Sequence, residues 1–263
     1  MRDCSCRKNT IGDYQCEVAL SERLSERILW LTMKCSELAE NARPGNGVMV
    51  FPSNCAEPFL GRPFGVADAD KKNGTVSVCY MLYGRGTGLM SEFKSGSTVR
   101  VRGFFGTPLH EPDGKVYLTG GGVGIAIFLL YNKMFPGRVA GLYLGIPGNG
   151  CERYAEKILL ILPNAKIFTD DGSFGEGDSM FKVLPKELGA GDEVWSCGPS
   201  GFLRAMRKHY ANGLDKLYLS LDKRMACGYG GCMGCVIETK DGPKRICVDQ
   251  SLFRADEVSE NDC

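Results

Sequence analysis

The sequence of 263 residues is poor in histidine, with only His110 and His209. A catalytic triad built on histidine is therefore not expected. The chain also lacks a long hydrophobic run: the longest, residues 125–131, is far shorter than the ~20 apolar residues that cross a bilayer. The first six residues lack the apolar core of a signal peptide. These absences predict a cytoplasmic protein that makes no contact with a membrane.

The chain also lacks an excess of charge of either sign. It has 32 Lys and Arg against 31 Asp and Glu, a net charge of +1, which gives no indication of a nucleic-acid partner. Hydrophobic residues make up 43% and charged residues 24%, as in ordinary globular proteins. The length favours two or three domains.

Cysteine, in contrast, is abundant, with thirteen residues. In a cytoplasmic chain this number indicates metal or redox chemistry rather than a disulfide framework, and an odd count excludes complete pairing within the chain. Cys197 belongs to a turn motif described below. Eight others form no recognisable ligand spacing and are expected to be free thiols: Cys4, Cys6, Cys16, Cys35, Cys55, Cys79, Cys151 and Cys263.

The remaining four are spaced as C-x4-C-x2-C-x11-C: Cys227, Cys232, Cys235 and Cys247. Glycines between the first three allow a tight loop with exposed backbone N–H groups. The spacing is typical of plant-type ferredoxins, which hold a [2Fe–2S] cluster. A structural zinc site remains an alternative, although a second C-x2-C pair is missing. A further alternative is that these cysteines form disulfides or an inert cluster.

The strand and helix signals divide the chain into three predicted domains. Residues 1–110 contain short β-rich stretches separated by turn residues, which predicts an antiparallel β-barrel. Residues 111–213 alternate strands with helices, which predicts a parallel α/β sheet. Residues 214–263 begin with a strand over 216–221 and hold the cysteine loop, where a bound metal would contribute much of the folding free energy. The strands of the first domain are expected at residues 14–19, 28–33, 47–51, 76–83 and 98–101. In the second, strands are expected at 116–119, 139–144, 165–169 and 193–197, and helices at 125–133, 152–162, 179–188 and 199–210.

Three turn motifs should meet at one edge of the α/β sheet. The glycine loop 120–124 joins a strand to a helix, where bare backbone lets a pyrophosphate approach the helix N-terminus. Asp170 to Gly175 and Cys197-Gly-Pro199 end two further strands of the same sheet. Because ligands bind beyond the carboxyl ends of parallel strands, we expect a nucleotide cleft there. Each motif alone could be an ordinary turn.

The first domain has two motifs of its own. Arg62-Pro-Phe-Gly65 offers a fixed backbone and a cation beside a planar or phosphorylated ligand. Gly84-Arg-Gly-Thr87 is a glycine turn whose N–H groups and hydroxyl suit phosphate.

Six motifs occur in an order that resembles the electron-transfer subunits of dihydroorotate dehydrogenase B, within the wider ferredoxin reductase-like family. They are RPFG, GRGT, GGGVG, TDDGSFG, CGP and the four spaced cysteines. The resemblance covers about residues 14–258. It includes LDKRMAC (221–227) and LFRADEV (252–258) on either side of the cysteine loop.

The resemblance implies FAD on the barrel, NAD(H) as substrate on the α/β domain and a [2Fe–2S] cluster that faces a partner. That partner is an FMN-containing catalytic subunit that oxidises dihydroorotate in pyrimidine biosynthesis, in a heterotetramer. FAD would contact Arg62, Pro63, Phe64, Gly65, Cys79, Tyr80, Met81, Gly86 and Thr87. NAD(H) would contact Gly121, Gly122, Gly124, Asp171, Cys197, Gly198 and Pro199. No side chain is expected to act as a general acid or base.

Two positions depart from the family. Gly65 stands where the family usually has Ser, and Met81 where it usually has Arg. FAD would then depend more on Arg62, Arg85 or backbone groups.

Two other functions remain open at this point. The small subunit of an NADH-dependent ferredoxin:NADP oxidoreductase, or of a sulfide dehydrogenase-like complex, has a similar layout, but a non-cysteine ligand replaces one cluster cysteine in that relative. The other is a zinc-stabilised nucleotide-binding module without redox activity.

Overall fold

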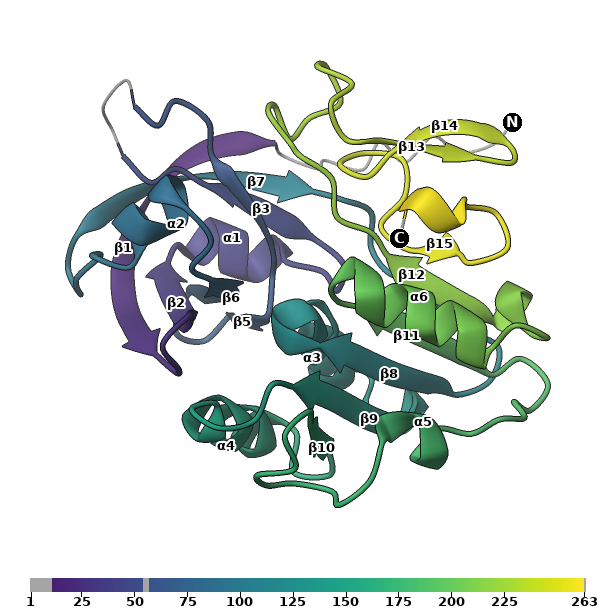
Figure 1. Cartoon of the computed structure of the whole chain (residues 1–263). Coiled ribbons are helices and arrows are strands. Elements are labelled where there is room, and N and C mark those ends of the chain that lie inside the picture. Colours follow the sequence, from purple (N-terminus) through teal and green to yellow (C-terminus); the bar gives the residue numbers. More distant parts are fainter. Residues whose placement is uncertain (1–10, 54–56, 263) are drawn as a thin grey trace.

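The computed structural model describes residues 11–53 and 57–262, which fold into a curled antiparallel sheet, a parallel α/β layer and a small C-terminal region (Figure 1). Cys4, Cys6, Cys55 and Cys263, expected to be free thiols, lie outside the described residues. In that part of the chain, no helix combines the length and the apolar character needed to cross a membrane.

The curled sheet has seven strands in the order β4-β3-β7-β1-β2-β6-β5, and all neighbours are antiparallel. It curls until β4 approaches β6, where the rings of Phe64 and Tyr80 lie 5.4 Å apart. Alternate side chains, such as Val76 and Val78, fill its interior. Its elements are β1 (Gly12–Arg23), β2 (Ile28–Lys34), α1 (Ser36–Asn41), β3 (Gly47–Val50), β4 (Arg62–Gly65), β5 (Asp68–Asp70), β6 (Thr75–Met81), α2 (Arg85–Met90) and β7 (Thr98–Phe105).

The second sheet has six strands in the order β10-β9-β8-β11-β12-β15, and all pairs are parallel except β12 with β15. The strands are β8 (Val116–Gly121), β9 (Val139–Ile146), β10 (Lys166–Thr169), β11 (Glu193–Cys197), β12 (Leu217–Ser220) and β15 (Phe253–Arg254). The helices are α3 (Ala126–Met134), α4 (Glu152–Ile161), α5 (Met180–Val183) and α6 (Ser200–His209), with single 3-10 turns at η1 (Gly122–Ile125), η2 (Pro136–Arg138), η3 (Leu214–Lys216) and η4 (Glu260–Asp262).

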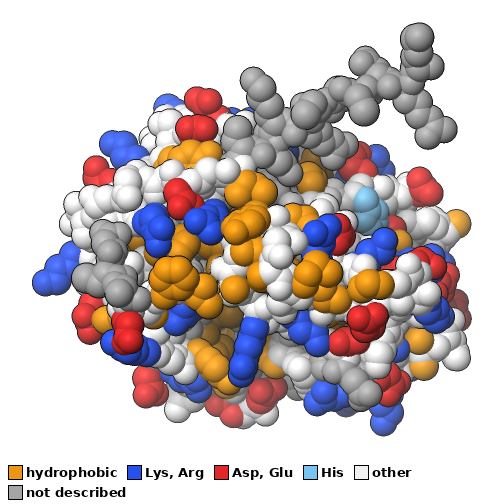
Figure 2. Space-filling view, turned by 90° about the horizontal axis from the view of Figure 1, so that it is seen from above, with side chains coloured by type: hydrophobic (Ala, Val, Ile, Leu, Met, Phe, Trp, Pro, Cys, Tyr) orange, Lys and Arg blue, Asp and Glu red, His pale blue; other side chains and the backbone are white. Residues whose placement is uncertain are grey.

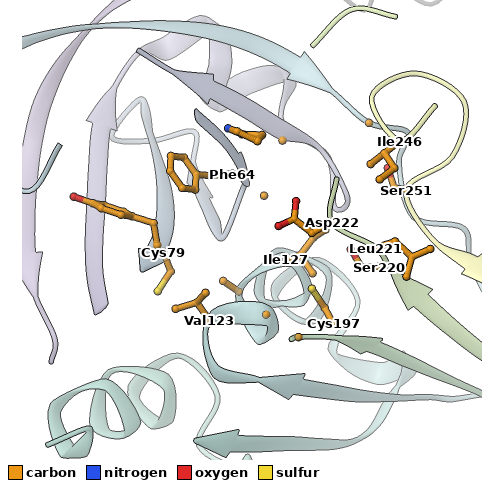
Figure 3. Close-up of a pocket in the computed structure, with 18 of the residues that line it drawn as sticks. Phe64, Cys79, Val123, Ile127, Cys197, Ser220, Leu221, Asp222, Ile246 and Ser251 are labelled. Carbon is orange, nitrogen blue, oxygen red and sulfur yellow. The ribbon is translucent and has the colours of Figure 1, made fainter. Parts of the chain in front are cut away.

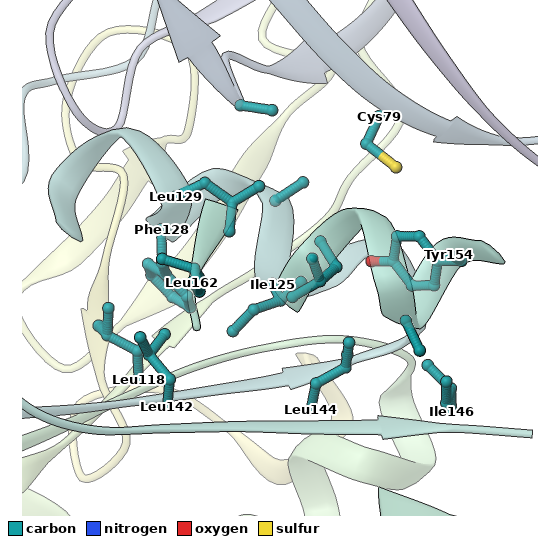
Figure 4. Close-up of a cluster of buried hydrophobic side chains, with 14 of the residues drawn as sticks. Cys79, Leu118, Ile125, Phe128, Leu129, Leu142, Leu144, Ile146, Tyr154 and Leu162 are labelled. Carbon is teal, nitrogen blue, oxygen red and sulfur yellow. The ribbon is translucent and has the colours of Figure 1, made fainter. Parts of the chain in front are cut away.

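Helices cover both faces of this sheet. Along β9, Leu142, Leu144 and Ile146 share one buried cluster with α3 and α4, whereas Tyr143 belongs to the cluster of α5 and α6. Figure 4 shows the first cluster, in which the leucines of β8 and β9 point toward Phe128 and Leu129 of α3. The sheet is therefore buried on both faces, as is usual for parallel sheets.

The predicted fold class is confirmed, with differences in three elements. The helix expected over residues 179–188 is wrong in length, since only α5 forms and Pro185 follows soon after its end. The strand expected over 216–221 is β12, which continues the parallel sheet instead of opening a separate unit. The motif 62–65, which was not among the predicted strands, is itself the edge strand β4.

The C-terminal region consists of the cysteine loop, the hairpin of β13 (Val236–Thr239) and β14 (Gly242–Arg245), and the segment leading to β15. Hydrogen bonds fix it to the curled sheet. Ser251 Oγ accepts a hydrogen bond from Thr107 N at 2.7 Å. On the opposite side, Lys157 of α4 pairs with Glu22 of β1 at 3.0 Å. The three parts therefore meet around one centre.

Candidate functional site: a shared cavity beside a cysteine loop

A cavity of about 460 Å³ lies where the three parts meet (Figure 3). The carboxyl ends of β8 and β11 form one wall, β4 and β6 a second, and the C-terminal segment a third. Cavities that are mostly apolar and hold a few polar groups are the usual binding sites for cofactors. Eleven of the residues predicted from the sequence line it: Pro63, Phe64, Gly65, Cys79, Tyr80, Met81, Gly121, Gly124, Cys197, Gly198 and Pro199.

The two turn motifs of the α/β sheet pack directly against each other. A Cβ atom added to Gly124 would lie 2.3 Å from Cys197 O and 2.8 Å from Gly198 N. One added to Gly198 would lie 2.9 Å from the Gly121 backbone. Only glycine allows this approach, which leaves bare backbone on the cavity wall.

On the opposite wall lie Gly65 and Met81, the two positions that depart from the family, and the structure explains the first of them. A Cβ atom added to Gly65 would lie 3.2 Å from the side chain of Ile127 in α3. A serine at this position would therefore require the Ile127 side chain to shift by a few tenths of an ångström. Met81 lies in the cavity wall and brings no charge there.

Arg62, Gly86 and Thr87 lie beside the cavity rather than in its lining. The Arg62 guanidinium covers Gly86, because a Cβ atom at Gly86 would be 2.4 Å from Arg62 Nε. Thr87 Oγ1 accepts hydrogen bonds from Tyr83 N and Gly84 N and donates one to Gly84 O. The hydroxyl is thus fully used in closing its own turn.

Asp171 and Gly122 also lie outside the lining. Asp171 accepts hydrogen bonds from Asn149 N at 2.8 Å and Ser173 N at 3.0 Å, so it joins the loops that follow β9 and β10. These bonds, with that from Asn149 the largest, lower the pKa of Asp171. The Gly122 carbonyl accepts a hydrogen bond from the Tyr154 hydroxyl at 3.0 Å.

Sequence reasoning missed the third wall. Ser220, Leu221, Asp222, Met225, Ile246 and Ser251 all line the cavity. The available signal was the LDKRMAC motif that precedes the cysteine loop, which contains Asp222. Its carboxyl group points into the cavity in Figure 3; the residue is exposed, and partial desolvation by the cavity wall raises its pKa.

The cavity thiols are not nucleophiles. Burial raises the pKa of Cys197 and of Cys79 to about 12, so both remain protonated near neutral pH.

The four spaced cysteines form two pairs. Cys235 Sγ and Cys247 Sγ lie 3.3 Å apart, and both residues are buried. Cys227 and Cys232 form the other pair, on the outer side. Backbone N–H groups serve as donors: Tyr229 N and Cys232 N lie 3.5 and 3.4 Å from Cys227 Sγ. Burial opposes ionisation, but these donors lower the pKa of Cys227 to about 6.

Two separated pairs suit two irons better than one zinc ion. Within the described ranges, no three metal-binding side chains are gathered tightly enough for a single ion. A [2Fe–2S] cluster distributes its four thiolates over two irons, whereas zinc draws all four to one centre. Gly228 and Gly230, with φ of +74° and +85°, wind the loop, and the side chains of Met49 and Val248 fill the space that a Cβ atom would need at these positions.

The loop lies between the cavity and the outer surface. Ile246 lines the cavity, and the next residue is the ligand candidate Cys247. On the outer side, Tyr229 and Met233 are 53% and 54% exposed. Seen from the end of the molecule that carries β13 and β14, hydrophobic side chains gather between charged ones (Figure 2). The cysteine loop thus connects the interior with the exterior.

The fold and this site define a class. The antiparallel and α/β parts, joined at a common cavity, are those of ferredoxin reductase-like proteins. Phthalate dioxygenase reductase has this fold, with a TM-score of 0.65, 14% identity and coverage of 91% of this chain and 95% of its own. A structure of NADH-dependent reduced ferredoxin-NADP oxidoreductase is more similar, with a TM-score of 0.82, 25% identity and coverage of 95% and 91%.

Within this class the particular family is clear. Residues 222–259 match the model of the iron-sulfur cluster binding domain of dihydroorotate dehydrogenase B. The dihydroorotate dehydrogenase B (NAD(+)) electron transfer subunit of Geobacillus kaustophilus is 32% identical over 257 residues, which cover 94% of this chain and 99% of that protein. The homolog of this subunit from Aquifex aeolicus is 30% identical over 253 residues, with the same coverage. The chain belongs to the family of dihydroorotate dehydrogenase B electron transfer subunits.

Proposed function

We propose that this protein carries electrons between NAD(H) and a dihydroorotate-oxidising partner through FAD and a [2Fe–2S] cluster. One observation carries the proposal: Ile246 forms part of the cavity wall, and Cys247, the next residue, belongs to the cysteine loop. A flavin in the cavity would therefore lie close to the cluster. Bound FAD exchanges a hydride with NAD(H) and passes single electrons, and a [2Fe–2S] cluster accepts one electron at a time.

The protein's own residues would bind the cofactors, orient them and exclude water from the cavity. Phe64, Tyr80 and the backbone of β4 and β6 offer an apolar wall for the flavin, and Arg62 beside Gly86 offers a cation for its phosphates. The touching turns at Gly121–Gly124 and Cys197–Pro199 would place nicotinamide against that flavin. Asp171 would act by holding two loops of the dinucleotide cleft. Cys227, Cys232, Cys235 and Cys247 would hold the cluster. No acid or base side chain is needed for hydride transfer.

The three-domain division stays a proposal, with boundaries after residues 110 and 213. β12 and β15 tie the third unit to the second through one sheet. We also propose a cytoplasmic location, supported by the nine described cysteines, all of which are free.

The partner we propose is an FMN-containing dihydroorotate dehydrogenase subunit, in a heterotetramer. A second candidate, the small subunit of an NADH-dependent ferredoxin:NADP oxidoreductase, is favoured by the 0.82 TM-score. The full set of four cysteines and the higher identity to dihydroorotate dehydrogenase B subunits favour the first.

The test is reconstitution. The protein is purified anaerobically, combined with an FMN-containing dihydroorotate dehydrogenase subunit, and assayed for NAD+ reduction by dihydroorotate. We expect activity that requires both subunits. A colourless protein containing zinc would refute the redox function, and capture of a large iron–sulfur flavoprotein instead of the FMN subunit would favour the second candidate.

A further inference from the structure

We propose that Asp222 is the proton-exchanging residue of the cavity, binding a proton when negative charge enters and releasing it when that charge leaves. The inference rests on the proposed function, because it requires a flavin in the cavity.

The first argument is the position of Asp222. It follows β12 directly, and its carboxyl group points into the open space between Phe64 and Ile127 in Figure 3. Asp222 borders the cavity and is exposed, so its carboxyl group is accessible to solvent. A carboxyl group placed this way can reach both a bound molecule and water in the cavity.

The second argument is the lack of a partner. Among the described residues, no group donates a hydrogen bond to the Asp222 carboxylate, and no Lys or Arg lines the cavity. The neighbouring Lys223 is turned away and pairs with Asp262 at 2.9 Å. Arg224 is exposed to solvent outside the lining. Without a counter-ion, nothing offsets the repulsion between the Asp222 carboxylate and a second negative charge in the cavity, so such a charge favours protonation of Asp222.

The third argument concerns the other titratable groups that face the same space. They are Cys197 at the end of β11, Cys79 and Tyr80 on β6, and Tyr83 after β6. Burial raises the pKa of both thiols to about 12 and raises that of Tyr80 further, so none of these three exchanges a proton near neutral pH. Tyr83 is 89% exposed at the rim. Of the residues that line the cavity, Asp222 is the one that carries a carboxyl group.

The charge balance gives Asp222 its role. A hydride from NADH leaves NAD+ and adds one negative charge to the flavin. One proton from solvent, bound by the Asp222 carboxylate, cancels that charge inside the cavity. When two electrons leave singly through the cluster, the hydrogen that arrived as hydride is released to solvent as a proton, and Asp222 returns its own proton to solvent as well. Atoms and charge balance over the cycle.

The test measures the midpoint potential of bound FAD against pH in the wild type, Asp222→Asn and Asp241→Asn. Asp241 is an exposed carboxylate in the β13–β14 turn, so its variant is a matched control. Each proton bound on reduction shifts the equilibrium tenfold per pH unit, or about 29.6 mV for a two-electron couple. We expect two protons per two electrons in the wild type and the control near neutral pH, and one in Asp222→Asn.

Equal slopes in all three proteins, with FAD bound, would overturn the role of Asp222 and leave the proposed function intact. Failure of the wild type to bind FAD would instead refute the proposed function. Should Asp222→Asn fail to fold, the infrared difference spectrum of the wild type decides. Flavin reduction should add a protonated-carboxyl band that shifts in heavy water, and a spectrum without this band would contradict the proposal.

Discussion

Gly124→Ala tests whether contact between the two glycine turns builds the nicotinamide site. The added methyl carbon would lie 2.3 Å from Cys197 O and 2.5 Å from Cys197 C, both backbone atoms at the end of a central strand. Such atoms cannot rotate away, so the turn itself must shift. Overpacking of this kind costs about 1–3 kcal/mol, and rigid neighbours place this site at the upper end.

The expected result has two parts. A decrease of about 3 kcal/mol in the free energy of unfolding lowers the melting temperature by roughly 6–12 °C in a protein of about 150–250 residues. A shift of the turn by about 1 Å would also slow reduction of FAD by NADH by about 10²-fold. Differential scanning calorimetry measures the first, and anaerobic stopped-flow absorbance the second.

Gly201→Ala is the matched control. Gly201 lies in α6, close in sequence to the same turn, and an added Cβ atom would meet nothing within 4 Å. Alanine favours a helix over glycine by up to about 1 kcal/mol, so this variant should be at least as stable as the wild type. A Gly124→Ala protein with wild-type melting and a wild-type rate of FAD reduction would refute the packing argument.

Three further predictions concern the cluster, the flavin and the cysteine loop. Cys232→Ser should abolish electron transfer to an external acceptor while NADH still reduces FAD, and equal loss of both in a folded variant would contradict the order of carriers. Arg62→Ala should weaken FAD binding by about 10- to 100-fold in a fluorescence titration, as expected for a lost charged hydrogen bond. Arg85, the other cation that the sequence offered for FAD, lies outside the cavity lining, is 70% exposed and pairs with Glu57 at 2.9 Å, so Arg85→Ala should not weaken it. Hydrogen bonding to Arg245 lowers the pKa of Asp249 to about 2. The Asp249→Asn variant should therefore be less stable than the wild type at every pH above the ordinary aspartate pKa. This difference in stability should disappear as the pH falls through about 2. A pH-independent difference in urea unfolding would contradict this.

The sequence predicted the strands that have a regular apolar pattern. β2, β8, β9 and β11 were expected within a few residues of their ends, because each carries a continuous β-rich stretch bounded by turn residues. β4 escaped prediction, because Arg-Pro-Phe-Gly has two residues that disfavour strands. It forms because β3 pairs with it at the edge of the sheet.

The candidate site was predictable where motifs follow strands of one sheet. The meeting of Gly124 with Cys197 follows from parallel strands whose carboxyl ends share an edge. Asp222 and Ile246 could not be placed, because their position depends on how the C-terminal segment folds back over the curled sheet. That arrangement rests on long-range contacts such as Ser251 with Thr107, which carry no local signal.

The central claim is that one electron path joins the cavity to the cysteine loop, and an anaerobic titration with NADH tests it most directly. Absorbance follows the flavin, and electron paramagnetic resonance follows the cluster. The flavin takes two electrons and a [2Fe–2S] cluster takes one, so both should be reduced in the wild type and the flavin alone in Cys232→Ser. A wild-type cluster that stays oxidised in the presence of fully reduced flavin would contradict the account.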